Sequence, residues 1–119
     1  MAITVSPHDR RVRVRFNGAV VADTARALAL REGSYPTVLY IPRADARMSH
    51  FERTARTSHC PHKGDASYFS LKVGDRTAEN AVWSYEAPFD QVAAIREHLA
   101  FYPDRVDAIE ELEAVPAAV

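Results

Sequence analysis

The sequence predicts a mainly β protein with one substantial helix. Residues 12–16 alternate apolar and arginine side chains and lead into Asn17-Gly18, and residues 66–73 and 76–85 flank Gly74-Asp75. A two-residue turn between such segments is the typical signal of an antiparallel hairpin, because its residues must accept positive φ. Residues 88–102 instead repeat apolar side chains at spacings of three and four, which indicates a helix.

Length and composition fit one compact domain. The chain has 119 residues, of which 47% are hydrophobic and 26% charged, the balance of a soluble globular protein. We expect residues 1–113 to form a single compact β domain and residues 114–119 to be a frayed C-terminal tail.

Net charge and cysteine content limit the classes of partner and the compartment that the sequence predicts. With 15 basic and 16 acidic side chains, the net charge gives no reason to expect nucleic acid or a membrane surface as a partner. One cysteine allows no disulfide within the chain, and the sequence shows neither a signal peptide nor an apolar run long enough to span a membrane. We therefore expect a cytoplasmic protein. A homo-oligomer is compatible with the sequence, which indicates no stoichiometry.

The first hairpin predicts a buried face and a basic face. Alternation places Val12, Val14 and Phe16 toward the core. The opposite face carries a ladder of three arginines, Arg11, Arg13 and Arg15, for which a solvated outer face is favoured over an anion site. Residues 27–30 and 37–41 favour strands. Residues 43–57 predict a short helical turn near 44–47 and then a surface connection.

The second hairpin has a predictable register. In an antiparallel ladder the numbers of paired residues keep a constant sum. If Val73 opposes Arg76, Ser70 is therefore expected opposite Glu79, Tyr68 opposite Ala81 and Ala66 opposite Trp83. One face then carries Phe69, Leu71, Val73, Ala78, Asn80 and Val82, and the other carries Tyr68, Ser70, Lys72, Glu79, Trp83 and Tyr85. Aromatic rings mixed with polar groups are typical of a ligand pocket, but also of a second small core under the helix. The sequence leaves both interpretations open.

The helix is expected over residues 88–102, with Asp90 as N-cap and Pro103 as its stop. Its apolar stripe consists of Val92, Ile95, Leu99 and Tyr102, so it should lie across the sheet. His98 either reaches the site or lies on the helix flank. Residues 106–112 are compatible with one further short element.

A site is expected at residues 59–69, where chemically active side chains gather. This segment holds the only cysteine, Cys60, with His59, His62, Lys63, Asp65 and Tyr68. Zinc binding by Cys60 and His62 would need further ligands from elsewhere. Cys60 could act as a nucleophile if Lys63 or a histidine lowered its pKa and Asp65 oriented it, whereas a buried inert thiol is more common. Lys63-Gly64 could hold a phosphate beside stacking aromatics, although no glycine-rich loop precedes it.

Five segments resemble one known family. They read RFNG at residues 15–18, YIPR at 40–43, CPHKGDASYF at 60–69, ENAVWSY at 79–85 and AFYPDRV at 100–106. Together they are similar to the bacterial domain-of-unknown-function family number 427, over residues 12–107. The family has a nucleotidyltransferase-like label, which the residues do not support, because no carboxylate pair is placed for two metals.

The resemblance also implies a fold. Members of this family resemble the Mss4-like or β-tent group, in which strands form two facing sheets. The zinc site of that group uses paired cysteines, so it should be missing from a chain with one cysteine. The thiol redox chemistry of the group lacks a resolving cysteine here.

The leading hypothesis is a small-molecule pocket, with catalysis left open. Its candidate catalytic residues are Cys60, Lys63 and Asp65, and its candidate ligand-binding residues are Tyr68, Glu79, Trp83, Tyr85 and His98. Lys63 and Asp65 are expected at the rim of the aromatic surface. No metal and no cofactor are expected. The alternative is a protein-interaction or regulatory module that uses exposed strands or the basic ladder, and a minor alternative is binding of a nucleotide or phosphate ligand.

Overall fold

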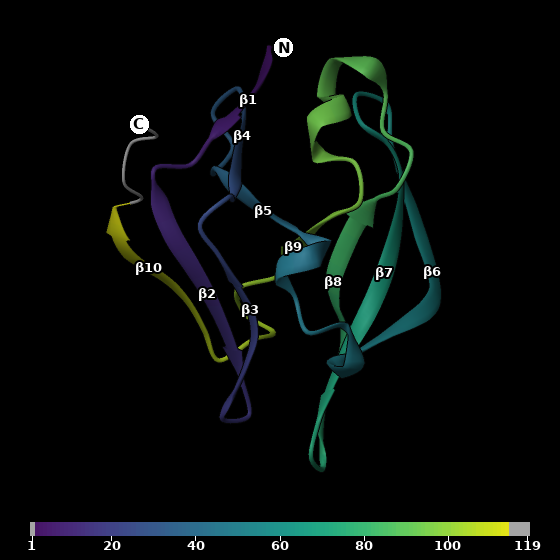
Figure 1. The fold of residues 1–119 in the computed structure, drawn as a ribbon. Helices are drawn as coiled ribbons and strands as arrows, with labels where there is room; N and C mark the ends of the chain where they lie inside the picture. Colours follow the sequence, from purple (N-terminus) through teal and green to yellow (C-terminus); the bar gives the residue numbers. More distant parts are fainter. Residues whose placement is uncertain (1, 115–119) are drawn as a thin grey trace.

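The structure is a computed structural model that describes residues 2–114, and within them it is built from strands and short 3-10 helices (Figure 1). In chain order the elements are β1 (Ile3–Pro7), β2 (Arg10–Phe16), β3 (Ala19–Thr24), β4 (Leu28–Glu32), β5 (Val38–Pro42), η1 (Arg43–Asp45), η2 (Met48–His50), β6 (Phe51–Cys60), β7 (Gly64–Val73), β8 (Arg76–Tyr85), η3 (Asp90–Ile95), β9 (His98–Phe101) and β10 (Ala108–Ala114). The mainly β prediction is confirmed.

The strands form two antiparallel sheets. The larger has seven strands in the order β1-β4-β5-β9-β8-β7-β6, and the smaller has three in the order β10-β2-β3. In Figure 1 the small sheet stands to one side of β5 and β9, and the long strands β6, β7 and β8 stand to the other. No helix within residues 2–114 is long and apolar enough to cross a membrane.

The first hairpin is as predicted. Asn17 and Gly18 have φ of 48° and 79°, as a tight turn between twisted strands requires. Val12, Val14 and Phe16 are buried in the core, and the three arginines lie on the other face of β2. Residues 27–30 and 37–41 fall largely in β4 and β5, as predicted, and the turn near 44–47 is η1.

The second hairpin turns where expected, but its predicted register holds only near the turn. Val73 pairs with Arg76 and Leu71 with Ala78, whereas Tyr68 pairs with Trp83. A bulge at residues 79–81 causes this change, because Asn80 adopts a φ of 50° and its backbone N–H donates to Ser70 Oγ at 3.0 Å. The slip is two residues, so the two faces of the hairpin keep their predicted composition.

The predicted helix over residues 88–102 is wrong. The chain forms only η3, whose Val92 has non-helical angles (φ −126°, ψ 25°), and then reverses at Glu97 with φ of 58°. It continues as β9, which pairs with both β5 and β8. A central strand covered on both faces reads as a continuous apolar run, and such a run resembles a buried helix in the sequence.

The surface connection predicted up to residue 57 is also wrong. Residues 51–60 form β6, the edge strand of the large sheet. Its register with β7 shifts between Arg53 and Thr57, and most of its side chains are exposed, which hides the period of a strand. Residues 108–114 form β10, and the rest of the tail expected at 114–119 lies outside the described residues.

The large sheet has a hydrophobic cluster on each face. One cluster lies against the small sheet and contains Val12, Val14 and Phe16 together with Leu71, Val82 and Leu99. The other contains Tyr40, Tyr68 and Tyr85 with Val92 and Ile95 of η3. Lys63, at the β6–β7 turn, forms an ion pair with Glu32 at the end of β4, and this contact shows that the sheet curls around the second cluster. These two segments lie toward opposite ends of the strand order.

Candidate functional site

A cavity of about 250 Å³ lies inside this curl of the large sheet. All five tyrosines of the chain and its only tryptophan line it. The complete lining is Leu30, Glu32, Tyr35, Pro36, Val38, Tyr40, Lys63, Tyr68, Trp83, Tyr85 and Tyr102. We call it the tyrosine cavity. Its walls are aromatic, and its only charged side chains are those of Glu32 and Lys63.

Trp83 is held from two sides in this cavity. Its ring meets the Tyr40 ring edge-on, with centroids 6.4 Å apart, and its Nε1–H donates to Tyr40 Oη at 3.3 Å. The Tyr102 ring tilts against it at 4.6 Å. Tyr68 is its direct cross-strand partner on β7. The indole is only half-buried despite these contacts, so part of it faces the cavity.

Lys63 and Glu32 place two opposite charges in the cavity wall. Lys63 Nζ donates to Glu32 Oε1 at 2.9 Å, and the two side chains are only 13% and 14% exposed. Burial lowers the pKa of Lys63, but Glu32 and the neighbouring Cys60 more than compensate, so the lysine pKa is raised. The ammonium also lies 6.0 Å from the Tyr85 ring centroid. Lys63 is therefore charged in a largely buried position.

The turn that presents Lys63 depends on a close backbone approach. Gly64 has φ of 114°, and a Cβ at this position would lie 3.4 Å from the carbonyl oxygen of Ala87. The Phe89 N–H donates to the Lys63 carbonyl at 3.0 Å. Only glycine combines this φ with this approach, so residues 87–89 and Gly64 together fix the lysine backbone.

Tyr68 and Tyr102 each have an arginine lying over their ring. Tyr68 Oη hydrogen bonds Ser58 Oγ at 2.8 Å, and Arg56 Cζ lies 4.9 Å from the Tyr68 ring centroid. Arg105 Cζ lies 4.6 Å from the Tyr102 ring centroid. We call these five residues the arginine edge of the cavity.

Tyrosine pKa values differ within the cavity. Burial raises the pKa of Tyr68, but hydrogen bonds from Ser58, Tyr102 and Arg56 outweigh it, so this pKa lies below its ordinary value. Burial and the Tyr68 hydroxyl raise the pKa of Tyr102. Burial also raises the pKa values of Tyr40 and Tyr85. The pKa of Tyr68 is thus lowered, whereas those of Tyr40, Tyr85 and Tyr102 are raised.

The structure brings together half of the residues proposed from the sequence. Lys63, Tyr68, Trp83 and Tyr85 line the cavity. Cys60 is half-buried behind the wall and lies beside Lys63 without lining the cavity. The expected position of Lys63 at a solvated rim does not match its low exposure.

The other predicted residues lie away from the cavity. Asp65 is 83% exposed and contacts His59 Nδ1 at 2.7 Å. Glu79 is exposed at the bulge of β8. His98 is half-buried on β9, where its ring nitrogen contacts the carbonyl of Arg96. None of these three lines the tyrosine cavity.

Sequence reasoning missed Glu32, Tyr35, Tyr40 and Tyr102. They come from the end of β4, the β4–β5 loop, β5 and the segment after β9, and none lies near residues 59–69 in the chain. The one available signal was compositional, since a tyrosine in a buried strand usually needs a partner for its hydroxyl.

A second, larger cavity of about 610 Å³ lies between the two sheets. Its lining is mainly apolar and includes Val12, Leu39, Ile41, Phe101 and Ile109. It shares Glu32, Tyr35, Pro36, Val38 and Trp83 with the tyrosine cavity, so the two are neighbours.

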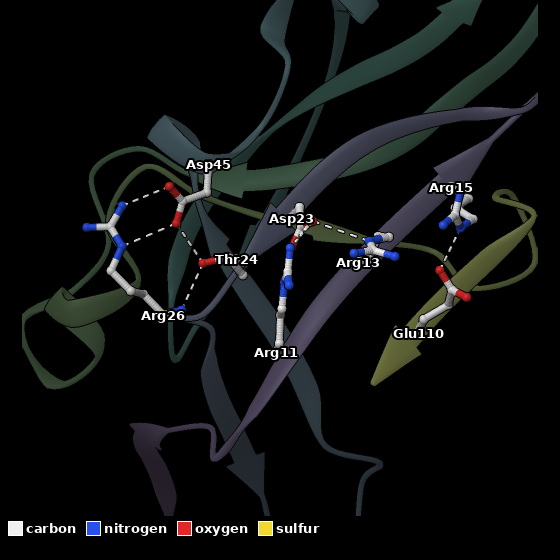
Figure 2. A network of polar contacts seen from close by, with 8 residues as sticks. All are labelled: Arg11, Arg13, Arg15, Asp23, Thr24, Arg26, Asp45 and Glu110. Atoms are coloured by element: carbon white, nitrogen blue, oxygen red, sulfur yellow. Dashed lines mark hydrogen bonds and ion pairs between the residues drawn. The ribbon is translucent and has the colours of Figure 1, made fainter. Parts of the chain in front are cut away.

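The arginine ladder on β2 is paired with carboxylates. Figure 2 shows Arg11 and Arg13 on Asp23 and Arg15 on Glu110 of β10, with nearest atoms 2.7, 3.3 and 2.7 Å apart. The hydrogen bond from Arg11, with a smaller contribution from Arg13, lowers the pKa of Asp23. In the same view Arg26 and Thr24 bind Asp45. The positive charge of the ladder is therefore largely compensated by carboxylates of the protein itself, which favours a solvated outer face over an anion site.

A further polar network surrounds Glu86. Both terminal nitrogens of Arg53 donate to it at 2.8 Å, with additional bonds from Ser67 at 2.9 Å and Arg43 at 3.2 Å. These bonds, with Arg53 foremost, lower the Glu86 pKa to about 2. Residues 2–114 contain no group of three or more His, Cys, Asp or Glu side chains that could hold a metal ion.

Comparison with known proteins identifies a family. A family model described as a domain of unknown function, DUF427, matches residues 4–112. No curated protein matches the chain. Because the family model covers most of the sequence, the chain belongs to the DUF427 family, and the resemblance seen in the sequence is confirmed. The Mss4-like or β-tent fold group stays a prediction.

Proposed function

We propose that the protein binds a small planar molecule in the tyrosine cavity. One observation carries the proposal: five tyrosines and the only tryptophan, from segments far apart in the chain, converge on a space that they do not fill. Aromatic walls with a few directed polar groups are how proteins hold small ligands. At about 250 Å³ the cavity suits one ring system rather than a large cofactor.

The polar groups of the cavity favour an oriented ligand. Lys63 and Glu32 offer a donor and an acceptor in one wall, and tyrosine hydroxyls offer both from another. Trp83 offers a half-buried face for stacking. A planar compound with polar substituents meets all three groups.

The main competing explanation is a second core closed by an ion pair. Tyr40, Tyr68 and Tyr85 are each at most 6% exposed, as core residues would be, and Lys63 with Glu32 links distant parts of the sheet. Protein interiors are normally packed without voids larger than a few waters. The space among these rings is instead open to solvent beside Tyr35, which is 64% exposed, so a ligand could enter it.

Binding is a better proposal than catalysis or protein recognition. Catalysis by Cys60 would need Asp65 to orient it, but Asp65 contacts His59 at the surface instead. Recognition of a partner protein by the arginine ladder would need free guanidinium groups, but these arginines form ion pairs with Asp23 and Glu110. Nucleotide binding remains a special case of the same cavity, with the base as the planar group.

The test is a thermal-shift screen of planar heteroaromatic compounds, accompanied by native mass spectrometry of the freshly purified protein. The cavity variant is Tyr102→Leu. Since all tyrosines line the cavity, the matched control is Phe51→Leu, which changes a half-buried aromatic ring packed against the cluster on the opposite face of the large sheet. Compounds that bind should raise the Tm of the wild type and of Phe51→Leu but not of Tyr102→Leu. A screen without any stabilising compound, or equal shifts in all three proteins, would contradict the proposal.

A further inference from the structure

Two arginines at the arginine edge have no acidic partner. Arg56 and Arg105 form no ion pair with any carboxylate among residues 2–114. Seven other arginines of the described chain do, namely Arg11, Arg13, Arg15, Arg26, Arg43, Arg53 and Arg76. Arg10, Arg31, Arg47 and Arg96 also form no such pair among the described residues. Of these unpaired arginines, Arg56 and Arg105 are the ones that lie against aromatic rings of the tyrosine cavity.

Both arginines are exposed and lie outside the lining of the cavity, but aromatic rings of its wall position them. Their guanidinium groups lie 4.9 and 4.6 Å from the ring centroids of Tyr68 and Tyr102, within the range of cation–π attraction. Arg105 also donates to the carbonyl of Asn80 at 2.9 Å, so the bulge of β8 anchors it. Stacking on rings that line the cavity holds the two positive charges next to it.

Hydroxyl donors complete this edge. Ser58 Oγ and Tyr68 Oη lie 2.8 Å apart, and Tyr102 lines the same cavity. Guanidinium and hydroxyl groups that converge without a carboxylate are the usual surroundings of a bound carboxylate or phosphate. The pKa of Tyr68 is lowered mainly by its hydroxyl neighbours, Ser58 first, with a smaller contribution from Arg56.

We propose that the ligand of the tyrosine cavity carries an anionic group, a carboxylate or a phosphate, which Arg56 and Arg105 bind. This inference rests on the proposed function. The planar part lies against Trp83, which is paired with Tyr68 on the adjacent strand. Tyr85 lies two residues further along β8, about 7 Å away, and the Lys63–Glu32 pair lies on that side. The anionic group thus points away from Lys63 and Glu32, toward the arginine edge.

The charges of the two sides fit such a ligand. On one side Lys63 is already neutralised by Glu32 at 2.9 Å, so it attracts an anion only weakly. On the other side two guanidinium groups lie on the rings of Tyr68 and Tyr102, and neither forms an ion pair with a carboxylate of the described residues. A planar anion therefore has one favoured orientation in the cavity.

The test compares matched neutral and anionic compounds by fluorescence titration of the single tryptophan, Trp83. The pairs are benzamide with benzoate, nicotinamide with nicotinate, and adenosine with adenosine 5′-monophosphate. In the wild type the anionic member of a bound pair should bind at least tenfold more tightly at low salt. The pair that shows this gain distinguishes a carboxylate from a phosphate. Arg56→Gln and Arg105→Gln should each remove most of the gain and leave the neutral member within twofold.

The matched control is Arg10→Gln, which removes an exposed arginine on β2 of the small sheet and should leave all affinities unchanged. Equal binding of neutral and anionic members, or a gain that survives in both cavity variants, overturns this inference while the proposed function stands. If no member of any pair binds to the wild type, the proposed function fails and this inference fails with it.

Discussion

Replacing Lys63 by methionine tests whether a buried charge pair holds the cavity together. Lys63→Met keeps the length of the side chain but leaves Glu32 without the ammonium that lies 2.9 Å away. Both side chains are largely buried, and breaking a buried ion pair costs about 3–5 kcal/mol. Some solvent reaches the pair, so we expect the lower end, about 3 kcal/mol of unfolding free energy.

A second ion pair provides the control. Lys72 Nζ lies at the same 2.9 Å from Glu52, but these side chains are 54% and 60% exposed. Exposed pairs contribute at most about 1 kcal/mol, so Lys72→Met should cost far less than Lys63→Met. The double variant Lys63→Met/Glu32→Gln removes both charges and should return to within about 1 kcal/mol of the wild type.

The free energy of unfolding of the wild type and the three variants is measured by urea denaturation at pH 7, with circular dichroism as the signal. The expected order of stability is wild type, then the Lys72→Met and double variants close to it, then Lys63→Met well below. Equal costs for Lys63→Met and Lys72→Met would refute the assignment of a buried pair. A double variant as unstable as Lys63→Met would show that the loss came from packing rather than from an uncompensated carboxylate.

Three other predictions follow from the polar groups and the cavity. The Glu86 pKa is lowered to about 2, so the hydrogen bonds of its carboxylate stabilise the fold above the ordinary glutamate pKa and are lost as the pH falls toward 2. Glu86→Gln should therefore lower the free energy of unfolding by up to about 3 kcal/mol at pH 7 and by less than half of that at pH 3, as measured by urea denaturation. Arg56→Gln should raise the pKa of Tyr68, read by tyrosinate absorbance and assigned with Tyr68→Phe, and an unchanged titration would count against the contact. Trp83→Ala should weaken a bound planar compound by about 1–3 kcal/mol in calorimetry, whereas an unchanged affinity would remove Trp83 from the site.

Local turn chemistry made the two hairpins predictable. Asn17-Gly18 and Gly74-Asp75 specify where the chain reverses, and strict alternation specifies the faces. The bulge at Asn80 was not visible, since asparagine occurs in strands as well as in left-handed positions. Its two-residue slip preserved the faces, and for this reason Tyr68, Trp83 and Tyr85 were grouped correctly although their partners were not.

The helix failed for a reason that tertiary structure alone supplies. Val92, Ile95 and Leu99 are all buried, as the stripe predicted, but Leu99 belongs to the cluster on the opposite face of the sheet from the other two. An apolar period of three and four describes one helix face, and it equally describes a 3-10 turn followed by a strand buried on both sides.

The site was predictable only where it is local in sequence. Lys63, Tyr68, Trp83 and Tyr85 lie on one hairpin and its entry, so density and alternation found them. Glu32, Tyr40 and Tyr102 reach the same cavity only because the large sheet curls. No pattern in a single sequence encodes that long-range closure.

The most direct test of ligand binding in the tyrosine cavity is the indole N–H resonance of Trp83 in a nitrogen-15 spectrum. The chain has one tryptophan, and its Nε1–H donates to Tyr40, so this single signal reports on the tyrosine cavity and on the larger cavity that Trp83 also lines. A shift that is lost in Tyr102→Leu assigns the binding to the tyrosine cavity, because Tyr102 does not line the larger one. Titration with the matched neutral and anionic compounds should shift it, and more strongly with the anionic members. If the signal does not move with any of these compounds, while the protein is folded, the tyrosine cavity is not a binding site.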